Sequence, residues 1–320
     1  MNKKGYIWMM PKGDTFPELM TQLEKWPKTR ALIDILGYAD HVMNRTYDDT
    51  QLKQGFTVMN TIGLPLALEV GAVKPWGTTG ADTFSKQKPM WDRFRGLGAD
   101  IAGIVMDEPL AAVHNRYDKS FSDIIEDTNE ARFEYAVEET AKFIGMVREE
   151  YPDWFVADIE VFPSFTADYV IRWIDALEAR LKEKGIRGQD FFRMDVDWNA
   201  FGVNYTNSLK ERVNLSWEQG WREVKRIEDH CRAINLPYSV TYWAANVPAS
   251  QDLQKDPASW CNGIMRMGQG YQDAGGRPDQ YAVQTWIGLP EKPLPETDPH
   301  SFTYSVLEFN KSFIPQKEEM

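Results

Sequence analysis

The stretch "IAGIVMDEPL", residues 101–110, runs from an apolar segment directly into two acids and a proline. A short apolar segment of this kind is typical of a strand in a parallel sheet that is buried on both faces. Burying a carboxylate costs free energy unless a partner stabilises it, so Asp107 and Glu108 need a reason to follow such a strand. The organisation of the rest of the chain indicates why two acids follow this strand.

Similar apolar segments recur along the chain and alternate with amphipathic ones. We expect strands at 5–10, 32–39, 65–71, 100–106, 154–161, 190–197, 237–243 and 280–287. Apolar residues at helical spacing predict helices at 16–26, 47–63, 88–98, 134–152, 167–185, 216–234, 259–276 and 302–313. The longest remaining stretch, 110–131, is polar and acidic, and we expect an irregular lid or binding loop there.

This alternation of strand and helix predicts an α/β fold. Eight such units in 320 residues favour a parallel sheet closed into a (β/α)8 TIM barrel, with residues 1–320 as one domain. The alternative is an open doubly wound sheet. We prefer the barrel because eight strands are many for an open sheet and because no GxGxxG or Walker pattern follows the first strand.

The composition excludes several functional classes. The formal net charge is −12 and we find no strong cluster of Lys and Arg, so we expect no nucleic-acid partner and no anionic membrane surface as a partner. No apolar run approaches the roughly 18 residues of a membrane span. The first 14 residues lack the apolar core of a signal peptide, so a cytoplasmic protein and the mature form of a secreted or periplasmic one both stay open.

The few cysteines and histidines argue against metal chemistry. Cys231 and Cys261 are too few for a disulfide scaffold, and we expect both to be buried packing residues. The four histidines are too scattered for the His-rich metal centres of hydrolytic barrels. We therefore predict no metal site and no other cofactor.

Polar side chains gather where the predicted strands end, which is where the active site of a (β/α)8 barrel lies. In chain order they are Asp40, His41, Glu69, Lys74, Trp76, Asp107, Glu108, Asp158, Glu160, Asp195, Asp197, Trp198, Tyr242, Trp243, Asn246, Gln284 and Trp286. A single acid at a strand end is more often a helix cap or an ion-pair partner, and a single Trp is more often core. Acids on five consecutive strands would repel one another in a purely structural site, so the joint pattern favours a functional cluster.

Alternation of side chains along a strand predicts which acids point into the barrel mouth. Asp158 and Glu160 share one face of their strand, and the apolar Ile159 between them suits packing against helices. The same argument applies to Asp195 and Asp197.

Both acid pairs are therefore expected in the mouth. Arg193 shares the parity of Asp195 one step deeper and could neutralise some of the negative charge. Asp107 and Glu108 face opposite ways, so at most one points fully inward, and we expect this to be Glu108.

Closely spaced carboxylates drive their pKa values apart, so that one can act as an acid while another stays ionised. This is the machinery of glycoside hydrolysis, and aromatic rings suit the apolar faces of sugars. We therefore expect a carbohydrate substrate, and we make no prediction of the oligomeric state. The predicted catalytic residues are Glu108, Glu160, Asp158, Asp195 and Asp197. The predicted substrate-binding residues are Asp40, Glu69, Lys74, Trp76, Asp107, Trp198, Tyr242, Trp243, Asn246, Gln284 and Trp286.

The predicted barrel with "MDEP" at the end of its fourth strand resembles the clan of (β/α)8 retaining glycoside hydrolases. In that clan the fourth strand ends in Asn-Glu-Pro and the Glu is the acid/base. The resemblance implies this role for Glu108, and it places Asp107 where the clan has an Asn that contacts a substrate hydroxyl.

The chain departs from the clan at the seventh strand, where the clan has a nucleophilic Glu and this chain reads "SVTYWAAN", residues 239–246. A chitinase-like DxxDxDxE is also absent from the fourth strand. Two mechanisms stay open. An inverting enzyme would pair Glu108 with a base among Glu160, Asp158, Asp195 and Asp197. A retaining enzyme would take its nucleophile from the fifth or sixth strand.

Two other functions are compatible with the pattern. The first is a metal-dependent barrel lyase or isomerase, in which Glu69, Asp107, Glu160 and Asp195 hold Mg²⁺ or Mn²⁺ through oxygen ligands. The second is a non-catalytic carbohydrate-binding barrel that lacks the seventh-strand Glu.

Overall fold

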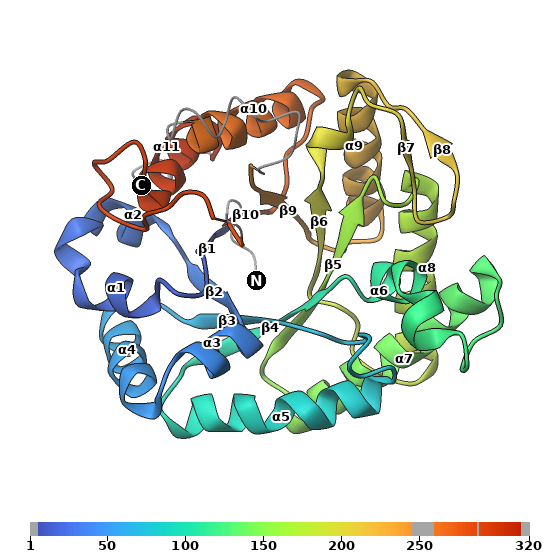
Figure 1. Ribbon diagram of the computed structural model, residues 1–320, viewed down its shortest axis with the longest axis horizontal. Helices are drawn as coiled ribbons and strands as arrows, with labels where there is room; N and C mark the ends of the chain where they lie inside the picture. The colour runs from blue at the N-terminus through green and yellow to red at the C-terminus, as the bar shows by residue number, and fades with distance from the viewer. Residues whose placement is uncertain (1–5, 245–258, 287, 315–320) are drawn as a thin grey trace.

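Eight parallel strands close into a barrel in the computed structural model, which describes residues 6–244, 259–286 and 288–314 (Figure 1). The strands are β1 (Tyr6–Met10), β2 (Ile35–Ala39), β3 (Leu66–Val70), β4 (Ile101–Asp107), β5 (Phe155–Phe162), β6 (Phe191–Val196), β9 (Tyr238–Tyr242) and β10 (Gln280–Gln284). They follow one another around the barrel in chain order, and β10 pairs with β1. The predicted (β/α)8 TIM barrel is confirmed.

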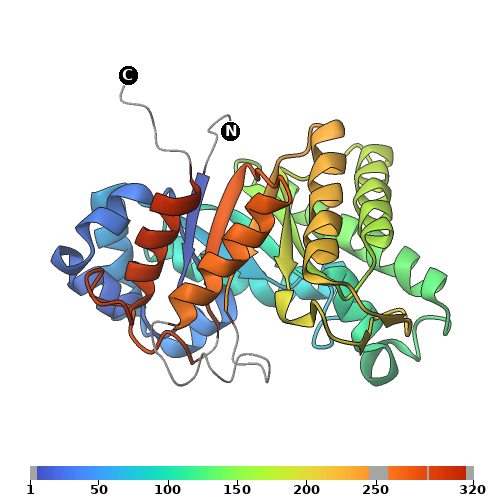
Figure 2. The same ribbon diagram turned by 90° about the horizontal axis from the view of Figure 1, so that it is seen from above.

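Helices surround the strands in Figure 1, and Figure 2 shows the same arrangement turned by 90°. They are α1 (Phe16–Thr21), α2 (Pro27–Leu32), α3 (Asp40–Thr46), α4 (Asp49–Ile62), α5 (Gly80–Gly96), α6 (Pro109–Asn115), α7 (Asn129–Glu150), α8 (Ala167–Glu183), α9 (Trp217–Ala233), α10 (Ser259–Asp273) and α11 (Phe302–Phe313). Short helical turns are η1 (Leu23–Lys25), η2 (Tyr117–Phe121) and η3 (Trp198–Ala200), and β7 (Tyr205–Thr206) pairs with β8 (Arg212–Val213) in a separate hairpin. None of the described helices is both long and apolar enough to cross a membrane.

Several helix boundaries differ from the prediction, as three examples show. The predicted helix 16–26 is divided into α1, η1 and the start of a new helix at Pro27. Helix α5 begins eight residues before the predicted Lys88, because Thr79 caps it by accepting from the backbone N–H of Asp82. The stretch 110–131 is not an irregular lid, since α6 and η2 occupy much of it and nearly all of α6 is buried.

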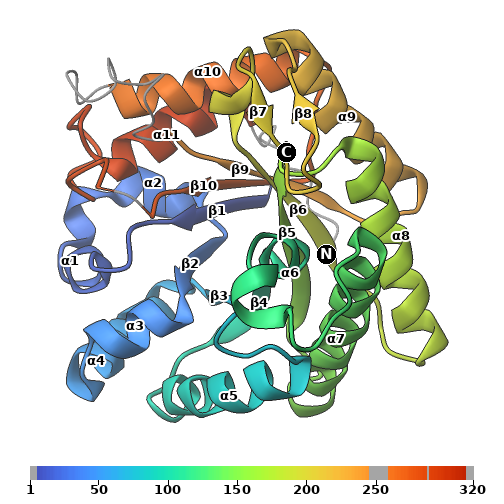
Figure 3. The same ribbon diagram turned by 45° about the vertical axis from the view of Figure 1, so that its right-hand side comes forward.

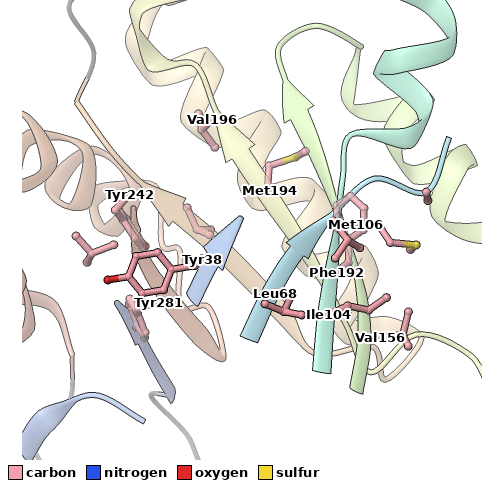
Figure 4. Packing of buried hydrophobic residues seen from close by; sticks show 14 of the residues in the cluster. Tyr38, Leu68, Ile104, Met106, Val156, Phe192, Met194, Val196, Tyr242 and Tyr281 are labelled. Atoms are coloured by element: carbon pink, nitrogen blue, oxygen red, sulfur yellow. The ribbon is translucent and has the colours of Figure 1, made fainter. Parts of the chain in front are cut away.

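The apolar side chains form an inner and an outer layer. The inner layer fills the barrel and consists of Trp8, Met10, Ile35, Ala67, Val105, Phe155, Ala157, Ile159, Phe191 and Ala282. The outer layer lies between strands and helices, and Figure 4 shows part of it, including Leu68, Ile104, Val156, Phe192 and Met194. Because side chains alternate along a strand, these two layers show which residues of each strand point into the barrel. Cys231 and Cys261 are both buried, as expected.

Candidate active site

Four carboxylates meet at the C-terminal mouth of the barrel, and we call Glu69, Asp107, Glu108 and Asp195 the mouth carboxylates. Glu69 and Asp107 each lie two residues beyond an inner-layer residue, and Asp195 has the parity of inner-layer Phe191. Alternation therefore turns all three inward. Glu108 follows β4 directly and is close enough to Asp107 and Glu69 for their charges to raise its pKa.

Glu108 has an unusual backbone that brings it to this group. Its φ of 47° and ψ of 56° lie in the left-handed region, which costs a residue other than Gly about 1–3 kcal/mol and is disfavoured before a proline. The Glu108 N–H donates to the carbonyl of Ile159 at 2.9 Å, and Pro109 opens α6. This conformation ends the strand's alternation, so the prediction that only one of Asp107 and Glu108 points to the mouth is wrong.

Lys74 is the counter-ion of Asp107, with Nζ 2.5 Å from Oδ2. It lies in a tight turn after β3, which two backbone hydrogen bonds between Lys74 and Gly77 close. Burial lowers the pKa of Lys74, but Asp107 and the other carboxylates around it prevail and leave its pKa raised. The ammonium therefore stays charged at the mouth and balances one carboxylate.

The other mouth carboxylates are crowded and poorly compensated. Burial raises the pKa of Glu108 to about 7, and the charge of Asp107 adds to the effect. Burial and Asp107 also raise the pKa of Glu69 to about 7, although Gln284 Nε2 donates to Glu69 Oε2 at 2.6 Å. The pKa of Asp195 is raised well above its ordinary value by burial and by Glu108. At neutral pH the group therefore holds both protonated and ionised carboxyls.

Arg193 forms the floor beneath the mouth carboxylates, one inward step below Asp195, as the alternation predicts. It is fully buried, its Nε donates to Ser239 Oγ at 2.9 Å, and its guanidinium lies 4.1 Å from the centre of the Trp8 ring. Burial lowers the pKa of Arg193 to about 9, while Glu69 and Asp195 oppose this shift. Its charge offsets part of the negative charge above it.

Two tryptophans form an aromatic wall beside Asp195. Trp243 Nε1 donates to Asp195 Oδ1 at 2.5 Å, and the Trp243 ring lies 4.8 Å from the Trp286 ring. Trp286 is 47% exposed, so its ring is available to a ligand. The mouth thus places an exposed apolar ring face beside titratable carboxyls.

Asp158 and Glu160 are not at the mouth, so the predicted facing of this pair is wrong. Ala157 and Ile159 belong to the inner layer, which turns the two acids toward the helices. Asp158 Oδ2 accepts from Trp173 Nε1 of α8 at 2.6 Å. Glu160 accepts from two backbone N–H groups at the start of α6, at 2.6 and 3.3 Å. Figure 3 shows α6 beside β5. Both acids bind helices, because the narrow barrel interior takes the apolar residues.

Three more predicted site residues are held in structural contacts. Asp40 is buried and accepts from the Trp91 indole of α5 at 2.8 Å. Tyr242 lies in the outer layer, and the centre of its ring is 4.4 Å from the centre of the Phe309 ring. Trp198 donates to the carbonyl of Trp243 at 2.9 Å, so it supports the aromatic wall from behind.

Two further predicted residues are not among the mouth carboxylates. Asp197 follows the end of β6 and caps η3 by accepting from the Asn199 N–H at 3.3 Å, so it does not share the inward direction of Asp195. Trp76 is 49% exposed and lines a cavity of about 450 Å³ with His41 and Met90, between α3 and α5. The predicted substrate contact Asn246 lies outside the described residues.

A cavity of about 400 Å³, which we call the β1 pocket, opens beside the mouth carboxylates. Its lining includes Lys12, Tyr38, Arg45, Glu69, Gln284 and Trp286. The sequence did not single out Lys12, Tyr38 and Arg45 as site residues, because the first strand has no acid at its end. Lys12, a basic residue two positions beyond the first strand, was the signal that could have found this side of the site.

The four oxygen ligands suggested for a metal enzyme do not all come together, because Glu160 is not among the mouth carboxylates. Glu160 faces α6, away from Glu69, Asp107 and Asp195. Within the described ranges, no three His, Cys, Asp or Glu side chains are grouped so that they could hold a metal ion.

Comparisons with known proteins support the fold. No family model matches the sequence, and no curated protein matches it. Haloferax volcanii malate synthase, in complex with pyruvate and acetyl-CoA, aligns with a TM-score of 0.54 at 11% identity over 98% of this chain and 70% of that one. A thermostable xylanase mutant from Cellvibrio japonicus gives 0.52 at 11% identity over 96% of both chains. Thermotoga maritima xylanase 10B gives 0.50 at 12% identity over 97% and 95%. These enzymes of different chemistry share the barrel with this chain.

Proposed function

We propose that the protein is a glycoside hydrolase that works with a pair of mouth carboxylates, Glu108 as proton donor and Asp195 as its partner. The observation that carries this proposal is the convergence of poorly compensated carboxyls beside an exposed Trp286 ring. Such a site offers acid, base and a stacking surface together, which is what cleavage of a glycosidic bond requires.

Glu108 suits the role of acid. Its pKa of about 7 keeps much of it protonated near neutral pH. In the described part of the chain no hydrogen bond fixes its carboxyl, so its proton is free to pass to a leaving-group oxygen. The anion that remains lies near Lys74, whose positive charge already lowers the pKa of Glu108.

Asp195 suits the role of the second carboxylate. The Trp243 N–H can only donate, so its hydrogen bond to Asp195 favours the ionised form. Burial is the largest cause that opposes this ionisation and the charge of Glu108 is the next, and only the second vanishes while Glu108 holds its proton. Asp195 would then attack the sugar carbon or activate water, at carboxyl separations of about 5–5.5 Å or about 6.5–9.5 Å respectively.

The test is reducing-sugar release from a broad panel of oligo- and polysaccharides, with and without EDTA. Wild type is compared with Glu108→Gln and with the matched control Glu134→Gln, which changes an exposed acid on α7. We expect release by wild type and the control, a loss of about 10²–10⁴-fold in Glu108→Gln, and no effect of EDTA. Activity that EDTA abolishes would indicate a metal-dependent lyase or isomerase instead. Glycan binding without release by wild type would indicate a non-catalytic barrel.

A further inference from the structure

A second cavity, which we call the hairpin pocket, lies beside the end of β6. It measures about 380 Å³, and its lining includes Asn115, Ser164, Asp197, Tyr205, Ser208 and Lys210. Hydroxyl, amide and charged groups dominate this lining, and its volume lies within the range of roughly 300–1,000 Å³ of small-molecule sites. The proposed carboxylate pair does not use this pocket.

The hairpin β7–β8 that forms one wall of the pocket is tied to the barrel. Ser208 N–H donates to the carbonyl of Ser164 at 2.8 Å, and the Tyr205 hydroxyl donates to the carbonyl of Pro163 at 3.1 Å. Asn207 is almost fully buried and accepts from the N–H groups of Leu209 and Glu211. The wall is therefore built in advance of any ligand, which lowers the entropic cost of binding.

The hairpin pocket and the β1 pocket lie on opposite sides of the barrel. Pro163 and Ser164 of the hairpin pocket directly follow β5. The strand order places β5 four positions from β1 in either direction, which is directly across the mouth. In Figure 1 the hairpin lies beside α9 and α8, and α1 and α3 lie on the other side of the strands. The β1 pocket includes Glu69, while the hairpin pocket includes Asp197, whose charge raises the pKa of Asp195. The mouth carboxylates thus lie between the two pockets.

We infer that the two pockets hold sugar units on either side of the cleaved bond, so that a linear glycan crosses the mouth and is cut inside its chain. This inference rests on the proposed function and names its substrate class. The charges favour an uncharged glycan, because Lys12 pairs with Asp14 at 2.7 Å on one side and the hairpin pocket contains both Asp197 and Lys210. On the β1 side, Trp286 offers a ring face for stacking.

The test maps where labelled oligosaccharides are cut, using a length series of the glycan that wild type hydrolyses. The hairpin-pocket variant is Asn115→Ala combined with Lys210→Gly, since Gly retains the left-handed backbone of Lys210. Asn235→Gly is the matched control, because Asn235 is an exposed residue with a similar backbone in the turn after α9. A single-sugar aryl glycoside serves as the short substrate.

We expect wild type to cut inside the chains. The hairpin-pocket variant should raise KM for long chains about tenfold and move the cleavage position, while the aryl glycoside and the control change less than twofold. Release of single sugars from one chain end by wild type, or an unchanged pattern in the variant, overturns the inference and leaves the proposed function intact. No hydrolysis of any glycan by wild type overturns the proposed function, and the inference with it.

Discussion

Two neighbouring strands carry nearly the same motif and use it in opposite ways. Strand β5 contains "DIE" at 158–160, and "DVD" at 195–197 spans the last two residues of β6 and the residue that follows it. Asp158 and Glu160 point to the helices, whereas Asp195 points into the mouth. The residue between the acids is apolar in both motifs. The direction of the acids follows from the residue before each motif, because neighbouring side chains on a strand face opposite sides. Ala157 before the β5 motif belongs to the inner layer, whereas Met194 before the β6 motif belongs to the outer layer.

The two faces give the same chemical group different tasks. Glu160 satisfies two N–H groups that no carbonyl within α6 can reach, and Asp158 satisfies a buried indole. Asp195 instead lies among carboxylates that oppose its ionisation. An acid on the outer face should therefore contribute mainly to stability, and an acid on the inner face mainly to activity. Each prediction below tests this division.

The largest effect is expected for Asp195→Asn. Asn keeps an acceptor for the Trp243 indole, so the shape of the site is preserved, but the variant cannot supply a carboxylate. We expect kcat/KM for the glycan to fall about 10³-fold. The free energy of unfolding, measured by urea titration, should stay equal or rise, because one of several crowded carboxyls is removed. A loss of stability with normal activity would assign Asp195 to structure.

Asp158→Ala should show the reverse pattern. It leaves the buried Trp173 N–H without its acceptor, which costs about 2–3 kcal/mol of unfolding free energy. Asp158→Asn keeps an acceptor and should cost less than half as much. Activity per folded molecule should match wild type in both variants. A 10²-fold loss of kcat in Asp158→Asn would show that the outer face takes part in the chemistry.

The pH dependence of kcat/KM and that of the free energy of unfolding should distinguish the two faces. Glu108 must be protonated to act as acid, and its pKa is about 7, so log kcat/KM should fall about one unit per pH unit above neutrality. Asp158→Asn should leave this limb in place. Its effect appears in stability, because folding raises the pKa of Asp158 from 3.8 to about 7. The Asp158 carboxyl therefore makes its full contribution to the free energy of unfolding below pH 3.8, and this contribution is lost as the pH rises through 7. The Asn in Asp158→Asn does not ionise, so the free energy of unfolding of this variant should fall less than that of wild type over the same interval.

The sequence was sufficient to predict the barrel, because strand and helix repeat with a clear period and each predicted strand segment overlaps an observed strand. It was insufficient for helix ends that depend on a single contact, such as the Thr79 cap of α5. Buried helix α6 was missed because its seven residues, Pro109–Asn115, are too few to show a helical period.

The sequence predicted the site in outline, but the prediction of which acids point inward was wrong in one systematic respect. Alternation states which residues share a face, but not which face is inside. Ile159 and Val196 are equally apolar, yet Ile159 fills the barrel interior and Val196 packs under the helices. A second source of error is the backbone of Glu108, whose left-handed conformation depends on Ile159 from another strand and leaves no mark in the local sequence.

A small gain in the free energy of unfolding is expected at that strained position. Gly adopts the left-handed backbone without steric cost, so Glu108→Gly releases strain while it loosens the unfolded chain, and we expect a net gain of about 1 kcal/mol in unfolding free energy. The same change at Asp158, which lies in a regular strand, should destabilise the protein. The Glu108→Gly variant should be as inactive as Glu108→Gln. A more stable but inactive protein would show that the fold holds Glu108 against its own backbone preference. A destabilised Glu108→Gly would instead mean that this carboxylate supports the structure, as the acids of β5 do.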